Sequence, residues 1–374
     1  MVNALLAAQA LGQSSWYDYI RRGILTTGEL SKLVQLGITG VTSNPTIFER
    51  AIAGSSDYDR PLAELARQGY DPTEIFETLA LEDIRDAADL LRSVYDHTDG
   101  TDGYISFEMS PYLAHDTQGS IAEGQRLFAA LGRPNVLIKV PATPEGIPAV
   151  RTLITEGINV NITLIFSLDA YQQVMEAYIG GLEDRVGRGE RVKGIASVAS
   201  FFVSRVDTAV DTLLQGRADA GETGLKELLG TAAIANARKA YSLFQEIFAA
   251  QRFVALKTKG AQVQRPLWAS TSTKNPAYPD TLYVDSLIGP HTVNTMPPAT
   301  VEAVLDHGNP RSTLEGSAQE ADAALDALAR AGVDMGQVTA QLLKEGVEAF
   351  AQSYDAVLAS VAAKCAKLVA GHAV

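Results

Sequence analysis

Short runs of β-branched and aliphatic residues alternate along this chain with longer segments whose apolar residues recur every three or four positions. The short runs are typical of buried strands, and the longer spacing is typical of amphipathic helices. The expected strands, each with its first residue, are SSWYDYI (Ser14), GVTSN (Gly40), YISFEM (Tyr104), NVLIKV (Asn135), NVNITLIF (Asn159), GIASVASFF (Gly194), PLWAS (Pro266) and TVNTM (Thr292).

The helix expected from Pro72 to Tyr95 has the clearest start signal. Asp71 can cap its first turn, Pro72 takes the first helical position, and Glu74 places an acid in the first turn. Another helix is expected after Ser167. Eight repeats of strand and helix predict an α/β fold with parallel strands, closed into a (β/α)8 TIM barrel. A doubly wound open sheet is the structural alternative.

Two regions exceed a minimal barrel. The segment from Thr208 to Gln264 is interpreted as an extended helical insertion, with GRADAGETG (from Gly216) as a loop between its helices. The whole chain, 1–374, is interpreted as one domain, with a barrel core of about 14–310 and extra C-terminal helices over about 315–372. An apolar stripe in the last helix is expected to pack on the barrel rather than on a partner helix. The stripe consists of Val347, Phe350, Tyr354, Val357, Val361, Cys365 and Leu368.

Composition narrows the class of protein. The 374 residues carry a formal net charge of -13, whereas a nucleic-acid or acidic-membrane binder would be basic. The single cysteine, Cys365, cannot form an intrachain disulfide, which fits a reducing, cytoplasmic compartment. The sequence contains no run of eighteen or more apolar residues, so no membrane-spanning helix is expected.

Polar residues interrupt the predicted strands near their carboxyl ends, although parallel strands buried on both faces are usually apolar throughout. Because the carboxyl ends of barrel strands converge on one mouth, these side chains are expected to line one pocket. They are Asp18, Thr42, Asn44, Glu108, Lys139, Asn161, Thr163 and Ser200.

Each of these residues also has a structural interpretation. Lys139 can belong to a buried ion pair, Asp18 can cap a helix, and Glu108 can pair with an arginine. The Asn, Thr and Ser residues can serve as turn or cap residues. Polar residues at the ends of six different strands nevertheless favour a common site.

Lys139 suggests the chemistry of that site. Burial disfavours the ammonium form of a lysine, and a neutral amine can attack a carbonyl carbon to form a Schiff base. Glu108 and Asp18 are suitable proton donors and acceptors, while neutral polar side chains can orient a polyhydroxylated substrate. Arg205 and the segment Ser270–Lys274 could bind a phosphate.

Other chemistries have little support in the sequence. The five histidines are scattered, with no metal-binding HExxH or paired-cysteine spacing. No G-x-G-x-x-G follows a predicted strand, and no Walker A loop occurs. No metal and no cofactor is therefore expected.

Six ordered motifs resemble the transaldolases, specifically the longer bacterial form. They are GVTSNPTIFERAI (Gly40), ISFEMSP (Ile105), VLIKVPATPEGI (Val136), GINVNITLIFS (Gly157), FFVSRVD (Phe201) and WASTSTKNPAYPDTLYVDSLIGPHTVNTMP (Trp268). The resemblance implies a metal-free class I aldolase-type barrel. Lys139 is similar to its Schiff-base lysine and Asp18 to its acid/base, while Glu108 and Thr163 resemble the pair that handles the catalytic water. The substrate ligands it implies are Thr42, Asn44, Asn161, Ser200, Phe202, Arg205, Ser272 and Lys274.

The chain departs from the family pattern at two places. Lys274 occupies a position where shorter members carry arginine, and a lysine binds phosphate as a point charge rather than as a fork. SFFVSR stands where SPFVGR is more familiar.

The resemblance implies reversible transfer of a dihydroxyacetone unit in the non-oxidative pentose phosphate pathway. Sedoheptulose 7-phosphate or fructose 6-phosphate would be the donor, and erythrose 4-phosphate or glyceraldehyde 3-phosphate the acceptor. The alternatives are a fructose 6-phosphate aldolase-like lyase and a non-catalytic sugar-phosphate-binding protein. Sugar phosphates are the expected partners of a monomer or homodimer, without nucleic acid or membrane.

Overall fold

Eight parallel strands form a closed barrel in the computed structural model, which describes residues 3–370. Neighbouring strands follow one another in sequence order, and pairing of β1 with β8 closes the barrel. The TIM-barrel prediction is therefore confirmed, and the open sheet is excluded. The strands are β1 Gln13–Tyr17, β2 Ile38–Thr42, β3 Ile105–Glu108, β4 Val136–Pro141, β5 Val160–Ile165, β6 Ser197–Phe202, β7 Arg265–Ala269 and β8 Thr292–Met296.

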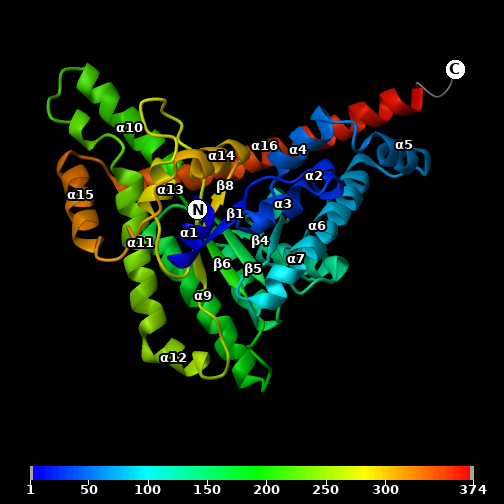
Figure 1. Cartoon of the computed structure of the whole chain (residues 1–374), viewed down its shortest axis with the longest axis horizontal. Helices are drawn as coiled ribbons and strands as arrows, with labels where there is room; N and C mark the ends of the chain where they lie inside the picture. The colour runs from blue at the N-terminus through cyan, green and yellow to red at the C-terminus, as the bar shows by residue number, and fades with distance from the viewer. Residues whose placement is uncertain (1–2, 371–374) are drawn as a thin grey trace.

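Helices connect the strands and surround the barrel (Figure 1). They are α1 Ala4–Ala10, α2 Arg22–Thr26, α3 Glu29–Gln35, α4 Pro45–Gly54, α5 Asp59–Arg67, α6 Pro72–His97, α7 Thr117–Leu131, α8 Gly146–Thr155, α9 Leu168–Gly187, α10 Ser204–Asp219, α11 Ala232–Ala249, α12 Gln251–Lys257, α13 Leu282–Ser286, α14 Pro298–His307, α15 Ala318–Arg330 and α16 Met335–Ala370, with short 3-10 helices η1 Pro111–Leu113 and η2 Lys226–Leu228. The predicted start of α6 is confirmed, because Asp71 and Glu74 form a reciprocal capping box. Helix α1 was not expected from the sequence.

The insertion predicted between Thr208 and Gln264 is helical, but its loop begins later than expected. Helix α10 continues through Asp219, so the first residues of GRADAGETG belong to the helix. The prediction was wrong there because Val210 and Leu214 extend a buried helical face that the glycine at 216 does not interrupt. The glycine costs only about 1 kcal/mol of helix propensity.

The predicted C-terminal helices correspond to α15 and α16; residues 371 and 372 of the expected segment lie outside the described residues. Figure 1 shows α16 running along one side of the barrel, from beside α10 to beside α5. Its contacts reach α4, α5, α6 and β5. Phe350, Val357 and Val361 of the stripe are buried, so packing of the stripe on the barrel is confirmed.

A bulky aromatic side chain of β1 packs tightly against β2, below the carboxyl ends of the two strands. Trp16 is fully buried, and its indole Nε1 donates a hydrogen bond of 2.8 Å to Asp102. A Cβ at Gly40 on the next strand would lie 2.4 Å from the Trp16 ring, so only glycine fits there. Trp16 and Gly40, which are paired across the two strands, therefore hold β1 close to β2.

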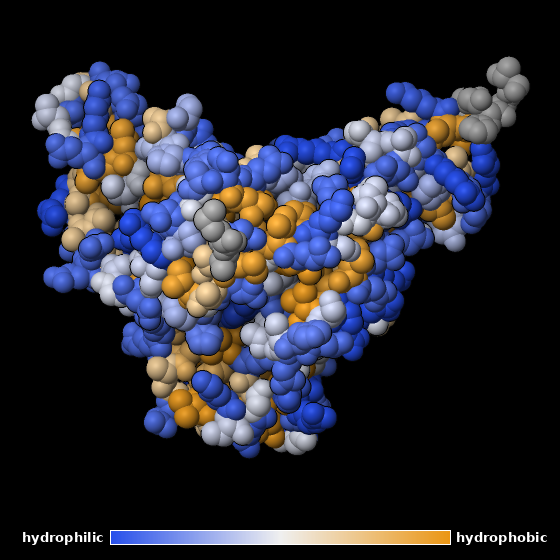
Figure 2. Space-filling model, in the orientation of Figure 1, coloured by the Kyte–Doolittle hydropathy of each residue, from blue (hydrophilic) through white to orange (hydrophobic). Residues whose placement is uncertain are grey.

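The exterior of the protein is largely polar on the face that can be seen in Figure 2. Among the described residues, no helix combines the length and the apolar character that a membrane-spanning helix needs.

Candidate active site

The register of three neighbouring strands places three predicted site residues at one level of the barrel. Glu108 on β3 is paired with Lys139 on β4, and Lys139 is paired with Asn161 on β5. Because residues paired across parallel strands have side chains on the same face, all three are brought together. The alternation read from the sequence therefore predicted which face carries them.

Lys139 belongs to a strand of otherwise apolar residues, and its side chain makes two polar contacts. Its Nζ donates to Glu108 Oε2 at 3.0 Å and to the main-chain oxygen of Ser43 at 3.1 Å. The two side chains of the ion pair are only 7% and 6% exposed, so solvent screens the interaction weakly. Burial raises the pKa of Glu108, and the nearby Lys139 acts in the opposite direction. This pair can hold a proton close to the amine.

A cavity of about 340 Å³ opens above Lys139 at the carboxyl ends of the strands. Ten of the twelve predicted site residues line it: Asp18, Thr42, Asn44, Lys139, Thr163, Ser200, Phe202, Arg205, Ser272 and Lys274. Glu108 contacts the cavity through Lys139, and Asn161 contacts it through Ser200. The structure therefore brings the predicted residues of seven strands and their following loops to one site.

Asp18 directly follows β1 and is partly buried at the cavity wall. Burial raises the pKa of Asp18, whereas Lys139 and Lys274 act to lower it. Asp18 caps no helix in the part of the chain that the structure describes, and the neighbouring helix α2 starts four residues later. Its carboxyl group is therefore available to exchange a proton with a molecule in the cavity.

Neutral polar groups form the floor of the cavity. Ser200 Oγ donates to Asn161 Oδ1 at 2.7 Å, and Asn161 Nδ2 donates to Ser106 Oγ at 2.9 Å. The Asn161 amide is thus oriented by its neighbours. Thr163 is 1% exposed, and its Oγ1 has no hydrogen-bond partner among the described residues. Buried hydroxyls are normally paired, so Thr163 has hydrogen-bonding capacity free for a bound molecule.

Asn44 combines a structural and a cavity-lining position. Its Oδ1 accepts a hydrogen bond of 3.0 Å from the main-chain nitrogen of Ile47 and so caps α4. The cap fixes the side chain in one orientation while it lines the cavity. Asn44 is therefore both a cap residue of α4 and a residue of the cavity wall.

One side of the cavity is cationic in a protein of net charge -13. Arg205, Lys274 and Arg50 line it, and Lys274 Nζ donates to Ser272 Oγ at 2.7 Å. Burial and the neighbouring Arg205 lower the pKa of Lys274. The Arg205 guanidinium also lies 5.3 Å from the centre of the Phe202 ring. A phosphate group placed here would relieve the repulsion among these cations.

Arg50 and Phe350 are among the cavity residues that sequence reasoning did not assign to the site. Arg50 lies on α4, within a motif already singled out, at a helical position whose direction only the folded helix defines. Phe350 was assigned to the packing stripe, but it also lines the cavity. Its distance from the other motifs in sequence gave no signal of this role. In the part of the chain that the structure describes, no group of three potential metal ligands occurs.

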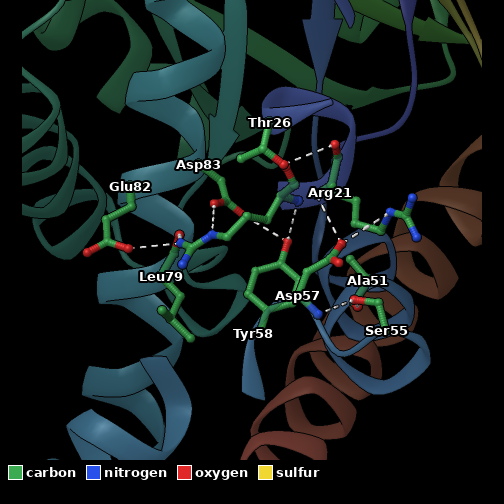
Figure 3. Close-up of polar contacts among 11 residues, drawn as sticks. Arg21, Thr26, Ala51, Ser55, Asp57, Tyr58, Leu79, Glu82 and Asp83 are labelled. Carbon is green, nitrogen blue, oxygen red and sulfur yellow. Dashed lines mark hydrogen bonds and ion pairs between the residues drawn. The ribbon is translucent and has the colours of Figure 1, made fainter. Parts of the chain in front are cut away.

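The loop after β1 is held by a buried network around Arg22. Arg22 Nε donates to Asp83 Oδ1 at 2.8 Å, and the Tyr58 hydroxyl donates to Asp83 Oδ2 at 2.7 Å (Figure 3). Tyr58 Oη also accepts a hydrogen bond of 3.0 Å from the Arg22 main-chain nitrogen. Asp18 lies four residues before Arg22, in the loop between β1 and α2. The hydrogen bonds of Arg22 therefore anchor the end of the loop that carries Asp18.

Asp83→Ala is expected to lower the free energy of unfolding by about 3–5 kcal/mol, because it leaves the Arg22 charge and the Tyr58 hydroxyl without their buried partner. Urea denaturation measures the change. Glu82→Ala is the control, since it removes the other Arg22 partner, whose side chain is 47% exposed, and should cost about 1 kcal/mol or less. Equal losses in the two variants would contradict a dominant role for Asp83.

Comparison with known proteins is consistent across nearly the whole chain. The family model described as transaldolase/fructose-6-phosphate aldolase matches residues 15–361. A transaldolase of Acidothermus cellulolyticus is 49% identical over 363 residues, covering 96% of each chain. Transaldolases of Trichodesmium erythraeum and Mycolicibacterium smegmatis are 44% and 46% identical, covering 98% and 95% of this chain and 99% and 95% of their own.

Proposed function

Because the chain belongs to the transaldolase/fructose-6-phosphate aldolase family, we propose that its cavity performs transaldolase chemistry through a Schiff base on Lys139. The transaldolase activity, a transfer of aldehyde or ketone groups, follows from the family and from relatives that match along nearly their whole length. Its usual place is the non-oxidative pentose phosphate pathway. The donor is sedoheptulose 7-phosphate or fructose 6-phosphate, and the acceptor is erythrose 4-phosphate or glyceraldehyde 3-phosphate.

One observation carries the assignment of the nucleophile. Lys139 is buried at the base of a cavity whose wall also contains Asp18 and the cationic residues Arg205 and Lys274. Its ion pair with Glu108 gives the ammonium group a carboxylate to which its proton can move. A ketose held by its phosphate at the cationic side would present its carbonyl to this amine.

The reaction then proceeds in balanced steps. The Lys139 amine adds to the ketose carbonyl, and loss of water, assisted by Glu108 and Thr163, gives the iminium. The Asp18 carboxylate takes the proton of the hydroxyl on the second carbon from the iminium carbon. That oxygen becomes the oxygen of the leaving aldehyde, the bond between the first and second carbons breaks, and its electrons form an enamine. After the first aldehyde leaves, the enamine carbon attacks the acceptor aldehyde, and Asp18 returns the proton to the new alkoxide. Water then releases the product ketose and restores the amine.

The neutral residues would recognise the hydroxyl groups of the sugar. Thr42, Asn44 and Ser200 line the cavity, with Asn161 orienting Ser200 from below. Phe202 supplies an apolar wall, and Ser272 adds a hydroxyl beside Lys274. We assign no residue to a cofactor or metal, because each step uses side chains of this chain alone.

Borohydride trapping tests the assignment directly. Incubation with fructose 6-phosphate and borohydride should reduce the Schiff base to a stable secondary amine, located by peptide mapping on Lys139. A parallel sample without the sugar should remain unlabelled at that peptide. Label on a different lysine, or none at all, would refute the proposed nucleophile.

The lyase alternative differs in the fate of the enamine. A fructose 6-phosphate aldolase would release free dihydroxyacetone when no acceptor is present, whereas a transferase retains the unit until an acceptor arrives. The relatives named above are transaldolases, which favours transfer. Quantifying free dihydroxyacetone with and without erythrose 4-phosphate separates the two activities, and a non-catalytic binding protein would give neither product.

Lys274→Gln is expected to raise the KM for fructose 6-phosphate about 10-fold or more while changing kcat little, because a charge-assisted hydrogen bond to phosphate is worth roughly 1.5–3 kcal/mol. Steady-state kinetics measure both constants. Lys226→Gln, which removes an exposed lysine far along the insertion, is the control for net charge. An unchanged KM for Lys274→Gln would remove this residue from the phosphate site.

Further features extend the proposal to the whole protein. We infer that residues 1–374 form one domain, since the C-terminal helices pack on the barrel. The charge of -13 supports a protein that does not bind nucleic acid, and its single cysteine supports a cytoplasmic location. We expect a monomer or homodimer, which sedimentation equilibrium would distinguish.

A further inference from the structure

One face of the long C-terminal helix contacts the mouth of the barrel. Gly346, Phe350 and Ser353 are spaced by four and three residues, so they lie on the same side of α16. Ser353 Oγ accepts a hydrogen bond of 2.8 Å from Thr46 on α4. Phe350, which lies between Gly346 and Ser353 on this face, lines the cavity. The helix therefore forms part of the active-site wall.

Phe350 lies directly over the proposed nucleophile. The Lys139 Nζ is 5.9 Å from the centre of the Phe350 ring, within the range of a cation–π contact. The ring is only 8% exposed, so its faces contact protein and cavity rather than bulk water. A phenyl ring has neither a proton to donate nor a lone pair to hold water. It gives the amine an apolar neighbour on the side where α16 crosses the barrel.

Gly346, one helical turn before Phe350, determines how closely α16 approaches the carboxyl end of β5. A Cβ at Gly346 would lie 2.8 Å from Leu164 Cδ2, so glycine allows the helix to approach β5 closely. Leu164 itself has a left-handed backbone, with φ of 60°, at the irregularity that follows Thr163. This strained conformation directs the β5 end toward the helix. Gly346 and Leu164 thus position Phe350 over the site.

Polar contacts hold the helix in place beyond this turn. Lys364 Nζ donates to Asp59 at 2.7 Å, and the Tyr112 hydroxyl donates to Asp355 at 2.5 Å. Asp59 lies on α5 and Tyr112 on η1, two separate elements outside the barrel. The Phe350 ring is consequently fixed rather than carried on a free segment.

We propose that Phe350 is a specificity-determining residue that keeps the Lys139-bound enamine for an aldehyde acceptor instead of a proton. In transfer, the enamine carbon forms a bond to the aldehyde carbon, and the aldehyde oxygen takes a proton. In the competing path, the enamine carbon takes a proton from water, a second water adds to the resulting iminium, and cleavage of the C–N bond releases dihydroxyacetone and the amine. Phe350 denies water a place beside the enamine.

This inference rests on the proposed function, and its experiment measures the ratio of two products. Phe350→Ala should raise the ratio of free dihydroxyacetone released to unit transferred by roughly 10-fold or more, because water can enter the vacated volume. Phe350→Leu restores apolar bulk and should keep the ratio near that of the parent protein. Gly346→Ala, which displaces the helix from Leu164, should raise the ratio while leaving the Phe350 ring itself unchanged.

Val357→Ala is the matched control for lost packing. Val357 is fully buried on the same helical stripe, seven residues beyond Phe350, but does not line the cavity. It should lower thermal stability and leave the product ratio unchanged. An unchanged ratio in both Phe350→Ala and Gly346→Ala, in protein that still melts cooperatively, would overturn the role of Phe350. Borohydride labelling of Lys139 in each variant reports the proposed nucleophile separately, so the two failures are distinguishable.

Discussion

Lys139→Met is expected to lower kcat/KM for transfer by about 10³-fold or more, because no other group can replace the covalent nucleophile. Methionine keeps an unbranched chain of similar volume but removes the amine, so the apolar surroundings of β4 remain filled. The variant should also show no borohydride-dependent label. Coupled assay of glyceraldehyde 3-phosphate formation and mass spectrometry measure the two losses together.

The control for Lys139→Met must separate chemistry from folding. Loss of the amine leaves Glu108 without its ion-pair partner, and burial already raises the pKa of Glu108. A buried carboxyl group that loses its cation becomes protonated, which limits the cost to stability. The double variant Lys139→Met/Glu108→Gln removes the remaining charge and should melt at least as high as the single variant. Transfer activity near the parent level in a folded Lys139→Met protein would exclude the Schiff-base mechanism.

The barrel was predictable from the sequence because its strands are short, apolar and regularly separated by helices. The residues at the site were predictable for a related reason. A parallel strand buried on both faces has little tolerance for Lys139 or Glu108 unless they meet a partner, so their presence marked the carboxyl ends. The strand register then placed Lys139 beside Glu108 and Asn161.

The limits of prediction lie in contacts between distant segments. Phe350 looked like an ordinary member of a packing stripe, since the path of α16 across the barrel depends on contacts made by Gly346, Lys364 and Asp355. Arg50 lies on α4, and its motif was recognised in the sequence, but the orientation of the helix could not be. Periodicity identifies the buried face of a helix, but it does not identify what lies opposite that face.

The second large effect expected is at Asp18, whose role differs from that of the lysine. Asp18→Asn should lower kcat by roughly 10²–10⁴-fold, because the amide cannot accept the proton released in carbon–carbon cleavage. Schiff-base formation uses Glu108 and Thr163 instead, so borohydride should still label Lys139 with fructose 6-phosphate. Rapid quenching should therefore find the Asp18→Asn protein loaded with uncleaved sugar. Glu108→Gln is the matched carboxyl control. Because Glu108 assists Schiff-base formation, this variant should slow the borohydride labelling of Lys139, whereas Asp18→Asn should not.

The pH dependence provides an independent check on Asp18. Burial raises the pKa of Asp18 above the ordinary aspartate value of about 3.9, despite the opposing Lys139 and Lys274 charges. Only the carboxylate can take the proton in cleavage, so kcat should rise with pH as Asp18 ionises, at a pH above that ordinary value. Lys274→Gln removes one cation that lowers the pKa of Asp18, and it should move this limb of the profile to still higher pH. A limb that stays in place in Lys274→Gln and persists unchanged in Asp18→Asn must belong to another group, because neither change would then act on the titrating carboxyl.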